Sequence, residues 1–375
     1  MDTKVKPPEV DPPEPEEEHD PDEAMPRVDV TRRGLIIGVL FVVSASAFLY
    51  FVLPQLTDLK DTGERVGEGN RWWLAAAFVF TLASFGGYVM MFQGIFVRAG
   101  SRIDWRASYQ ITMAGLAATR LFAAGGAGGI ALTAWALRRS GMPRRKVADK
   151  TLAFLILTYA VYMAALVVCG FGLYLDLLPG PGPFAITVVP AFFALVVIVL
   201  ALGLSRVPPD LQRRLEGFER RGGRLAHIAQ RLANAPAAFS AGLREALWHV
   251  RERDPALLGA VAYWGFNIAV LWACFHAFGV PPPLAVIIMG YFVGFLGNLL
   301  PLPGGIGGVD GGMIGAFAAF GVGLSLVVPA VLAYRILTFW LPTIPGAIAY
   351  FQLRRTVARW REERHARDLP AAAGA

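Results

Sequence analysis

Three charged residues stand inside otherwise apolar stretches of the sequence: Arg120, Asp310 and Arg335. Charged side chains are costly inside a bilayer and normally pair with each other or line a cavity, so each is a candidate functional residue. Two arginines and one aspartate leave a site with a net positive charge. Because a guanidinium offers a planar fork of donors that matches two phosphate oxygens, the three residues favour the binding of a phosphate group.

Glycine-rich segments adjoin these charges. Asp310 lies in LPLPGGIGGVDGG (300–312), which has two prolines and six glycines, and Arg120 precedes AAGGAGG (123–129). A helix cannot run smoothly through such segments, because proline lacks a backbone N–H and glycine adopts conformations that other residues avoid. We expect two half-helices to begin near Gly129 and Gly311, with free N–H groups and a positive dipole end that favour an anion.

A structural role is open for each charged residue as well. Arg335 could pair with Asp310 and stabilise the fold, since buried ion pairs are often architectural. Asp310 could instead cap a helix that begins at Gly311. Arg120 could extend to the aqueous face of the membrane if the segment that carries it is shallow.

The composition is typical of a membrane protein, with 55% hydrophobic and 17% charged residues. Soluble domains have about a quarter of their residues charged. At ~1.5 Å per helical residue, a run of about 20 apolar residues crosses the hydrocarbon core of a bilayer. The apolar runs predict six full spans, at residues 34–53, 72–97, 151–178, 184–204, 255–279 and 324–351.

Two further apolar segments, 110–137 and 284–323, are predicted to return to the side from which they entered. Segment 110–137 has basic residues beyond both ends, as cytoplasmic loops do. Counting the spans then places both ends of segment 284–323 outside. The predicted fold is all-α and polytopic, with six full spans and two re-entrant helical hairpins arranged as an inverted repeat. Such repeats are typical of transporters whose site lies near the membrane midplane.

Three segments are polar or charged, one of them inside the predicted transmembrane domain (32–355). Residues 1–31 hold eleven acids and three bases, a composition typical of a disordered tail that could bind a protein partner. Residues 205–254 hold ten arginines and six acids, with apolar residues at helical spacing that favour helices lying on the anionic inner leaflet. Residues 356–375 are predicted to form a basic C-terminal tail. Both termini are predicted to be cytoplasmic.

The sequence contains no motif of a common catalytic or nucleotide-binding site. No lysine follows a glycine, so there is no Walker A sequence, and HExxH, GxSxG and clustered cysteine and histidine sequences are absent. We therefore expect no catalytic residues, no cofactor, no bound metal and no nucleic-acid partner. Gly290 and Gly294, at GxxxG spacing, favour helix packing over contact with a ligand.

The second glycine-rich segment and the last span carry a resemblance to a known family. PLPGGIGGVDGG (301–312) and LAYRILTFWLPTIPG (332–346) resemble the membrane region of lysylphosphatidylglycerol synthases and the related flippase-like (UPF0104) membrane proteins. Asp310 stands where the family usually has glutamate. AGGAGGIALTAWALRRSGMP (124–143) is similar to the family's first glycine-rich stretch but lacks its proline. The residues that match the family pattern in the second segment and last span are Pro301, Pro303, Gly304, Gly305, Gly307, Tyr334 and Arg335.

The resemblance covers most of residues 34–355 and implies movement of a lipid head group across the bilayer. Synthesis is not implied, because the aminoacyltransferase domain of the full synthases is absent from this sequence. We expect a phosphate-bearing lipid, either a phospholipid or a polyprenyl-phosphate lipid, to move between the leaflets of a bacterial cytoplasmic membrane. The expected substrate-binding residues are Arg120, Gly126, Gly128, Pro303, Gly304, Gly305, Gly307, Asp310, Tyr334 and Arg335.

Two other functions stay open. One is a non-transporting membrane scaffold that recruits a lipid-modifying partner through its charged segments. The other is an enzyme or accessory protein that acts on lipid-linked sugars in cell-envelope synthesis.

Overall fold

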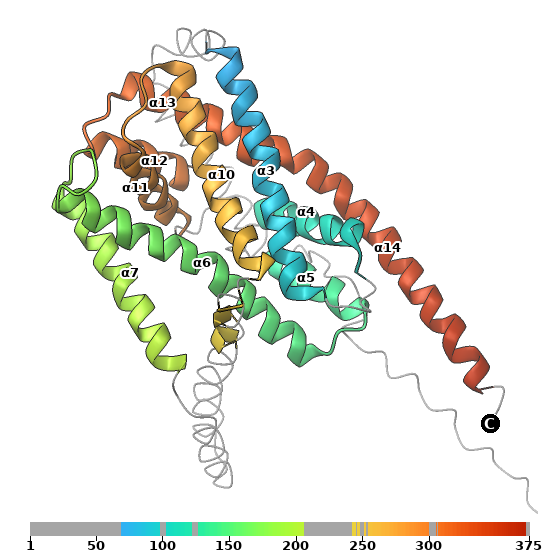
Figure 1. Cartoon of the computed structure of the whole chain (residues 1–375). Coiled ribbons are helices and arrows are strands. Elements are labelled where there is room, and N and C mark those ends of the chain that lie inside the picture. Colours follow the sequence, from blue (N-terminus) through green and yellow to red (C-terminus); the bar gives the residue numbers. More distant parts are fainter. Residues whose placement is uncertain are drawn as a thin grey trace, which may run out of the picture.

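The computed structural model describes residues 69–97, 103–121, 127–205, 254–299, 305 and 307–372, together with 242–244, 246–247 and 251–252. Every regular element in these ranges is helical (Figure 1). The predicted span 34–53, the acidic tail 1–31 and most of segment 205–254 lie outside the described residues. In chain order the elements are α3 (Arg71–Phe96), α4 (Trp105–Leu121), α5 (Ala127–Arg139), α6 (Arg144–Tyr174), α7 (Phe184–Ser205), α10 (Pro255–Phe278), α11 (Leu284–Phe295), the 3₁₀ turn η1 (Leu296–Leu299), α12 (Gly308–Ala319), α13 (Leu324–Arg335), the π-helical turn η3 (Ile336–Trp340) and α14 (Leu341–Ala372).

Five helical segments of the described chain are long and apolar enough to cross a membrane. They correspond to five of the six predicted spans, and the sixth, 34–53, lies outside the described residues. The last of them runs without a break through α13, η3 and the first part of α14. The five segments are Arg71–Phe96, Arg144–Tyr174, Phe184–Gly203, Pro255–Phe278 and Leu324–Glu363.

The start of α6 differs from the prediction. The helix begins at Arg144 rather than at residue 151, so Lys150 lies in the helix and not in a basic loop. Its side chain is buried, and Nζ donates a hydrogen bond to the carbonyl oxygen of Ile95. That carbonyl belongs to the last turn of α3, where backbone acceptors have no partner within the helix and a lysine can satisfy them.

The last helix also extends beyond the predicted span, which ended at residue 351. α14 continues to Ala372, because the following sequence is rich in arginine, glutamate and alanine, all good helix formers. Leu353 and Trp360 on one side of this extension are buried in the hydrophobic cluster that contains the start of α4. The predicted basic tail 356–375 is therefore largely a helix that packs on the bundle.

Helices α3 and α10 lie side by side and antiparallel near the centre of the fold (Figure 1). The N–H of Asn70, which precedes α3, donates to the carbonyl oxygen of Ala277 at the end of α10, at 2.9 Å. The two backbones approach closely at Gly87 and Gly259, where an added Cβ on Gly259 would lie 2.5 Å from the Met91 nitrogen. Small residues permit helices to pack at such a distance inside a membrane.

One end of the bundle, here called the basic end, holds most of the basic residues of the described helices. The start of α4 and the extension of α14 meet there, since Thr356 Oγ1 donates to Gln110 Oε1 at 2.8 Å. Three of the described connections, 175–183, 279–283 and 320–323, lie at the opposite end and together contain one charged residue, Asp176. The positive-inside rule requires this distribution if the basic end is cytoplasmic, an assignment that stays a prediction. The basic residues at this end are Arg106, Arg138, Arg139, Arg144, Arg145, Lys146, Arg354, Arg355, Arg359 and Arg361.

Two helical hairpins enter the bundle from opposite ends. α4 and α5, the first hairpin, pack against each other and open toward the basic end. α11 and α12, the second hairpin, open toward the other end, and the positive φ values of Gly305 and Gly307 before α12 (66° and 81°) fit the predicted break of the helix. Gly290 and Gly294 lie against Phe317 and Met313 of α12, which confirms their predicted role in helix packing.

Substitution of Gly259 by alanine is expected to push α10 away from α3 and to destabilise the protein. The added Cβ would lie 2.5 Å from Met91 N and 2.7 Å from Gly87 O, and overpacking of this kind costs roughly 1–3 kcal/mol. Gly265→Ala in the same helix is the matched control, because nothing lies within 4 Å of its added Cβ. Thermal unfolding in detergent should show a lower midpoint for G259A and an equal or higher one for G265A. Equal midpoints for the two variants would contradict the close contact.

Candidate functional site

A cavity of about 310 Å³, here called the central cavity, lies where the two hairpins meet the long helices. Arg120 of the first hairpin and Arg335 of the last spanning helix both line it, so the fold brings together two of the three buried charges identified in the sequence. Most of the other polar lining residues carry a hydroxyl or amide group. They are Tyr88, Thr119, Thr158, Tyr159, Tyr263, Asn267, Asn298, Tyr334 and Thr338.

Arg335 forms a buried ion pair with Asp310. Its Nε lies 2.5 Å from Asp310 Oδ1, and the two side chains are 10% and 8% exposed. The other carboxylate oxygen, Oδ2, accepts the N–H of Gly307 at 2.9 Å, so both oxygens have a partner. Burying a charge is costly unless an opposite charge and hydrogen bonds compensate for the lost water. The predicted pairing of the two residues is confirmed, and it ties α13 to the start of α12.

Asp310 does not cap a helix that begins at Gly311. α12 begins three residues earlier, at Gly308, and Asp310 is its third residue. From this position the carboxylate reaches back to the N–H of Gly307, whose φ of 81° suits glycine. A negative charge in the first turn also stabilises the positive end of the helix dipole. The capping hypothesis was therefore wrong in position, and Asp310 both stabilises the start of α12 and pairs with Arg335.

Arg120 does not extend to the aqueous face. Its guanidinium donates to two backbone carbonyls of the last spanning helix, from Nη2 to Thr338 O at 2.7 Å and from Nη1 to Phe339 O at 3.0 Å. The first of these carbonyls is available because Pro342, four residues later, has no N–H to complete the α-helical bond. Residues 336–340 also form a π-helical turn, an irregularity that is frequent at functional sites. Arg120 thereby ties the first hairpin to segment 335–340. Arg335, in the same segment, is tied to the second hairpin through Asp310.

The ring of Phe339 contacts both guanidinium groups. The guanidinium carbon of Arg335 lies 4.5 Å from the ring centroid, and that of Arg120 lies 5.3 Å from it. Cation–π attraction stabilises a desolvated guanidinium but leaves its charge in place. Among the described residues at this site, two arginines thus face the single carboxylate of Asp310. The local field favours an anion as the ligand.

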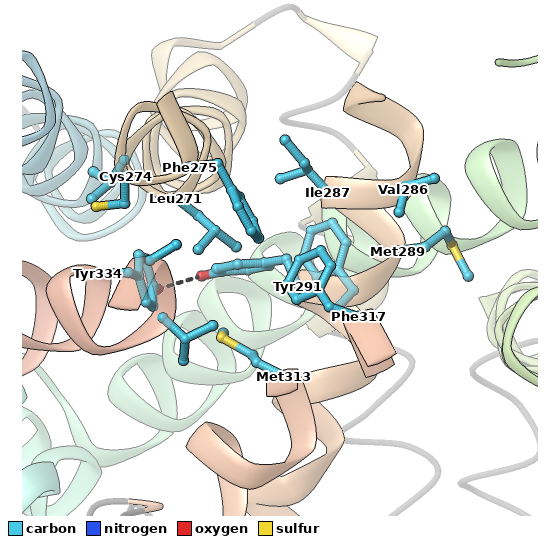
Figure 2. Packing of buried hydrophobic residues seen from close by; sticks show 14 of the residues in the cluster. Leu271, Cys274, Phe275, Val286, Ile287, Met289, Tyr291, Met313, Phe317 and Tyr334 are labelled. Carbon is cyan, nitrogen blue, oxygen red and sulfur yellow. Dashed lines mark hydrogen bonds between the residues drawn. The ribbon is translucent and has the colours of Figure 1, made fainter. Parts of the chain in front are cut away.

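The ring of Tyr334 lines the central cavity, and its hydroxyl is bonded within the helix bundle. The hydroxyl lies 3.1 Å from the Tyr291 hydroxyl and 3.5 Å from Asn267 Oδ1. Figure 2 shows the bond to Tyr291 among buried side chains of the surrounding helices. Asn267 in turn donates to Ser84 Oγ at 2.5 Å. These bonds join α3, α10, α11 and α13 and position Arg335, the neighbour of Tyr334, while contact between Tyr334 and a substrate stays a prediction.

The described glycines that were expected to contact a ligand differ in whether they line the central cavity. Gly305, with a φ of 66°, lines the central cavity, and Gly307 donates its N–H to Asp310. Gly128 lies in the first turn of α5 and is not among the lining residues. Three of the expected binding residues, Gly126, Pro303 and Gly304, lie outside the described residues.

Sequence reasoning missed the hydroxyl groups of the cavity wall. Tyr88, Thr158 and Tyr263 come from α3, α6 and α10, and each stands in an apolar span with no charge near it in the sequence. A single hydroxyl in such a span has no periodicity or motif that separates a cavity-lining residue from a packing residue. The packing of the spans around the hairpins decides which hydroxyls line the cavity.

The fold and the site define a helical membrane protein with a buried, positively charged cavity between two opposed hairpins. Residues 35–346 match the family described as the lysylphosphatidylglycerol synthase TM region. The chain belongs to this family and is an integral multi-pass membrane protein.

Three curated relatives come from Methanothermobacter thermautotrophicus, and each is described as a UPF0104 membrane protein. One is 32% identical over 150 residues, which is 39% of this chain and 43% of the relative. A second is 30% identical over 208 residues (51% of this chain and 58% of the relative), and a third is 40% identical over 86 residues (23% and 26%). The matched regions thus span less than two thirds of each relative.

The ion pair between Arg335 and Asp310 is expected to show strong coupling in a double-mutant cycle. Arg335→Met leaves the Asp310 carboxylate buried without its cation, and breaking a buried pair in this way costs roughly 3–5 kcal/mol. The double variant R335M/D310N removes the uncompensated charge and is expected to recover part of that loss. Thermal unfolding of the single and double variants measures the coupling. A double variant no more stable than R335M would count against a paired, buried carboxylate.

Proposed function

We propose that this protein moves a phosphate-bearing lipid between the two leaflets of the membrane, with the phosphate bound by Arg120 and Arg335. The observation that carries the proposal is the convergence of two arginines on one buried cavity beside a single carboxylate. A charged head group loses its water in the hydrocarbon core, which is costly. Guanidinium donors and hydroxyl groups that replace this water lower the cost of passage.

We further propose that the fold is an inverted repeat, with one unit formed by α3 to α6 and the other by α10 to α14. α3 and α10, the first helices of the two units, pack antiparallel. The Tyr162 hydroxyl of α6 donates to the Phe292 carbonyl of α11 at 2.6 Å, and Arg120 of α4 donates to Thr338 in the last helix of the second unit. Each hairpin therefore contacts the last helix of the other unit, as oppositely oriented repeats would require. Re-entrant placement of both hairpins brings their tips toward the membrane midplane.

Both arginines bind protein groups at the positions where a phosphate would bind. Arg335 pairs with Asp310, and Arg120 holds the carbonyls of Thr338 and Phe339. A phosphate that binds the guanidinium groups competes with these contacts and weakens the attachment of the hairpins to segment 335–340. Head-group occupancy is thereby coupled to hairpin movement, because a ligand shifts the conformational equilibrium by its preference for one state.

The proposed substrate class is defined by the phosphate and includes phospholipids and polyprenyl-phosphate lipids. We place the basic end and both termini in the cytoplasm, with segment 205–254 on the anionic inner leaflet and the acidic tail 1–31 available to a protein partner. The cytoplasmic membrane is the proposed location. The relatives come from an archaeon, so the expectation of a bacterial membrane gains no support from them.

Purified protein in vesicles is expected to move fluorescent phosphatidylglycerol between leaflets, measured as the fraction that dithionite can quench. Arg120→Gln and the double variant R335M/D310N are each expected to slow this movement at least tenfold. A hydrogen bond to a charged group contributes about 1.5–3 kcal/mol, and 1.4 kcal/mol is about a factor of ten. Arg355→Gln, at an exposed position of α14, is the matched control and should keep the native rate.

The same vesicles distinguish the other functions. A scaffold predicts no lipid movement by the purified native protein, and an enzyme predicts a chemically altered lipid by mass spectrometry. Native rates in both cavity variants, with unfolding midpoints that show them to be folded, would overturn the assignment of the site. A fluorescent neutral diacylglycerol, which crosses bilayers unaided, should move at the same rate with and without the protein.

A further inference from the structure

We propose that the lipid head group enters the central cavity from the basic end, through a narrow passage between α3, α4, α5 and α6. This inference rests on the proposed function. A second cavity of about 70 Å³, here called the throat, adjoins the central cavity. The two cavities have five lining residues in common: Tyr88, Thr119, Ile130, Phe154 and Leu155. These five residues therefore border both cavities.

The throat extends from the central cavity toward the basic end. Thr112, Thr133 and Thr151 line the throat and not the central cavity. Each of these threonines is compared with a residue of the same helix that lines both cavities. In all three helices the threonine is the one nearer the basic end. These shared residues are Thr119 in α4, Ile130 in α5 and Phe154 in α6. Three helices thus give the same direction for the passage.

The wall of the throat combines threonine hydroxyls with aromatic and aliphatic side chains. Thr151 Oγ1 is buried and has no hydrogen-bond partner among the residues that the structure describes. A buried polar atom without a partner is destabilising, so such atoms are rare unless water or a ligand satisfies them. The hydroxyls of Thr112 and Thr119 donate to carbonyls of their own helix, at Ser108 and Gly115, and a hydroxyl oxygen that donates can still accept a hydrogen bond. The throat therefore offers hydrogen bonds to a passing head group or to its water.

The size of the throat shows that the passage is closed in this structure. A water molecule takes about 30 Å³ in the liquid, so a cavity of about 70 Å³ holds water but no phospholipid head group. Exposed cations stand at the basic end near the starts of α4 and α6, and they attract anionic head groups from the adjoining leaflet. These cations are Arg106, Arg144, Arg145 and Lys146. Opening of the throat then admits a head group that is already concentrated at its entrance.

Obstruction of the throat tests this passage. Thr133→Trp is expected to slow the movement of fluorescent phosphatidylglycerol at least tenfold, because the indole fills the space through which the head group must pass. Ala131→Trp, on the exposed side of the same helix, is the matched control and should keep the native rate. Movement at the native rate in folded T133W would overturn the throat and leave the proposed function intact.

A second measurement does not depend on transport. Cys169 and Cys274 are the cysteines of the chain and both are buried, so their replacement by alanine gives a background for single labels. Thr133→Cys is expected to react with the anionic reagent methanethiosulfonate ethylsulfonate, which enters when the throat opens, at least ten times faster than Ala136→Cys, a fully buried position of the same helix that lines neither cavity. Equal rates would overturn a hydrated throat. Rapid reaction of T133C in a protein that moves no lipid would instead overturn the proposed function and, with it, the role of the throat in head-group entry.

Discussion

A charge or a backbone carbonyl that is buried in an apolar environment must find a partner, and this constraint organises the centre of the fold. Segment 335–340 presents the guanidinium of Arg335 and the carbonyl of Thr338, which Pro342 leaves without its α-helical donor. Asp310 satisfies the guanidinium and Arg120 satisfies the carbonyl. Asp310 and Arg120 belong to different hairpins. The bonds that satisfy the buried polar groups of segment 335–340 therefore hold both hairpins in place.

The main features of this arrangement could be predicted from the sequence, because costly residues are visible in it. A charge in an apolar run and prolines between glycines mark Arg335, Asp310 and the break before α12 without any structure. The choice between a pairing and a capping role for Asp310 depended on where α12 begins, and the glycines around it do not fix that position. The partners of Arg120 could not be predicted, since they are backbone carbonyls and any residue type supplies those.

The predicted start of α6 and the predicted end of the last span were wrong because hydropathy does not fix where a helix begins or ends. Hydropathy predicts where a helix leaves the hydrocarbon core, and the helix itself ends only where its hydrogen bonds end. Lys150 and the extension of α14 lie beyond the apolar runs, yet both are helical, and tertiary contacts add to the local helix propensity there. A lysine that meets the carbonyl of Ile95 and a tryptophan, Trp360, that packs beside α4 are interactions between distant segments. Neither has a signal in the local sequence.

Segment 335–340 is attached to the two hairpins by bonds of different kinds, and under the proposed function this difference bears on which bonds a head group would replace. The second hairpin is attached through the ion pair of Asp310 and Arg335, whereas the first is attached through bonds from Arg120 to neutral carbonyls. Bonds between two ionised groups are the stronger kind, and separating Arg335 from Asp310 would leave a buried carboxylate without its cation. Under the proposed function, a phosphate would therefore displace the carbonyls from Arg120 at lower cost than it would displace Asp310 from Arg335. Under the proposed function, the bonds replaced first would be those of Arg120, which belongs to α4–α5, the hairpin that lines the throat.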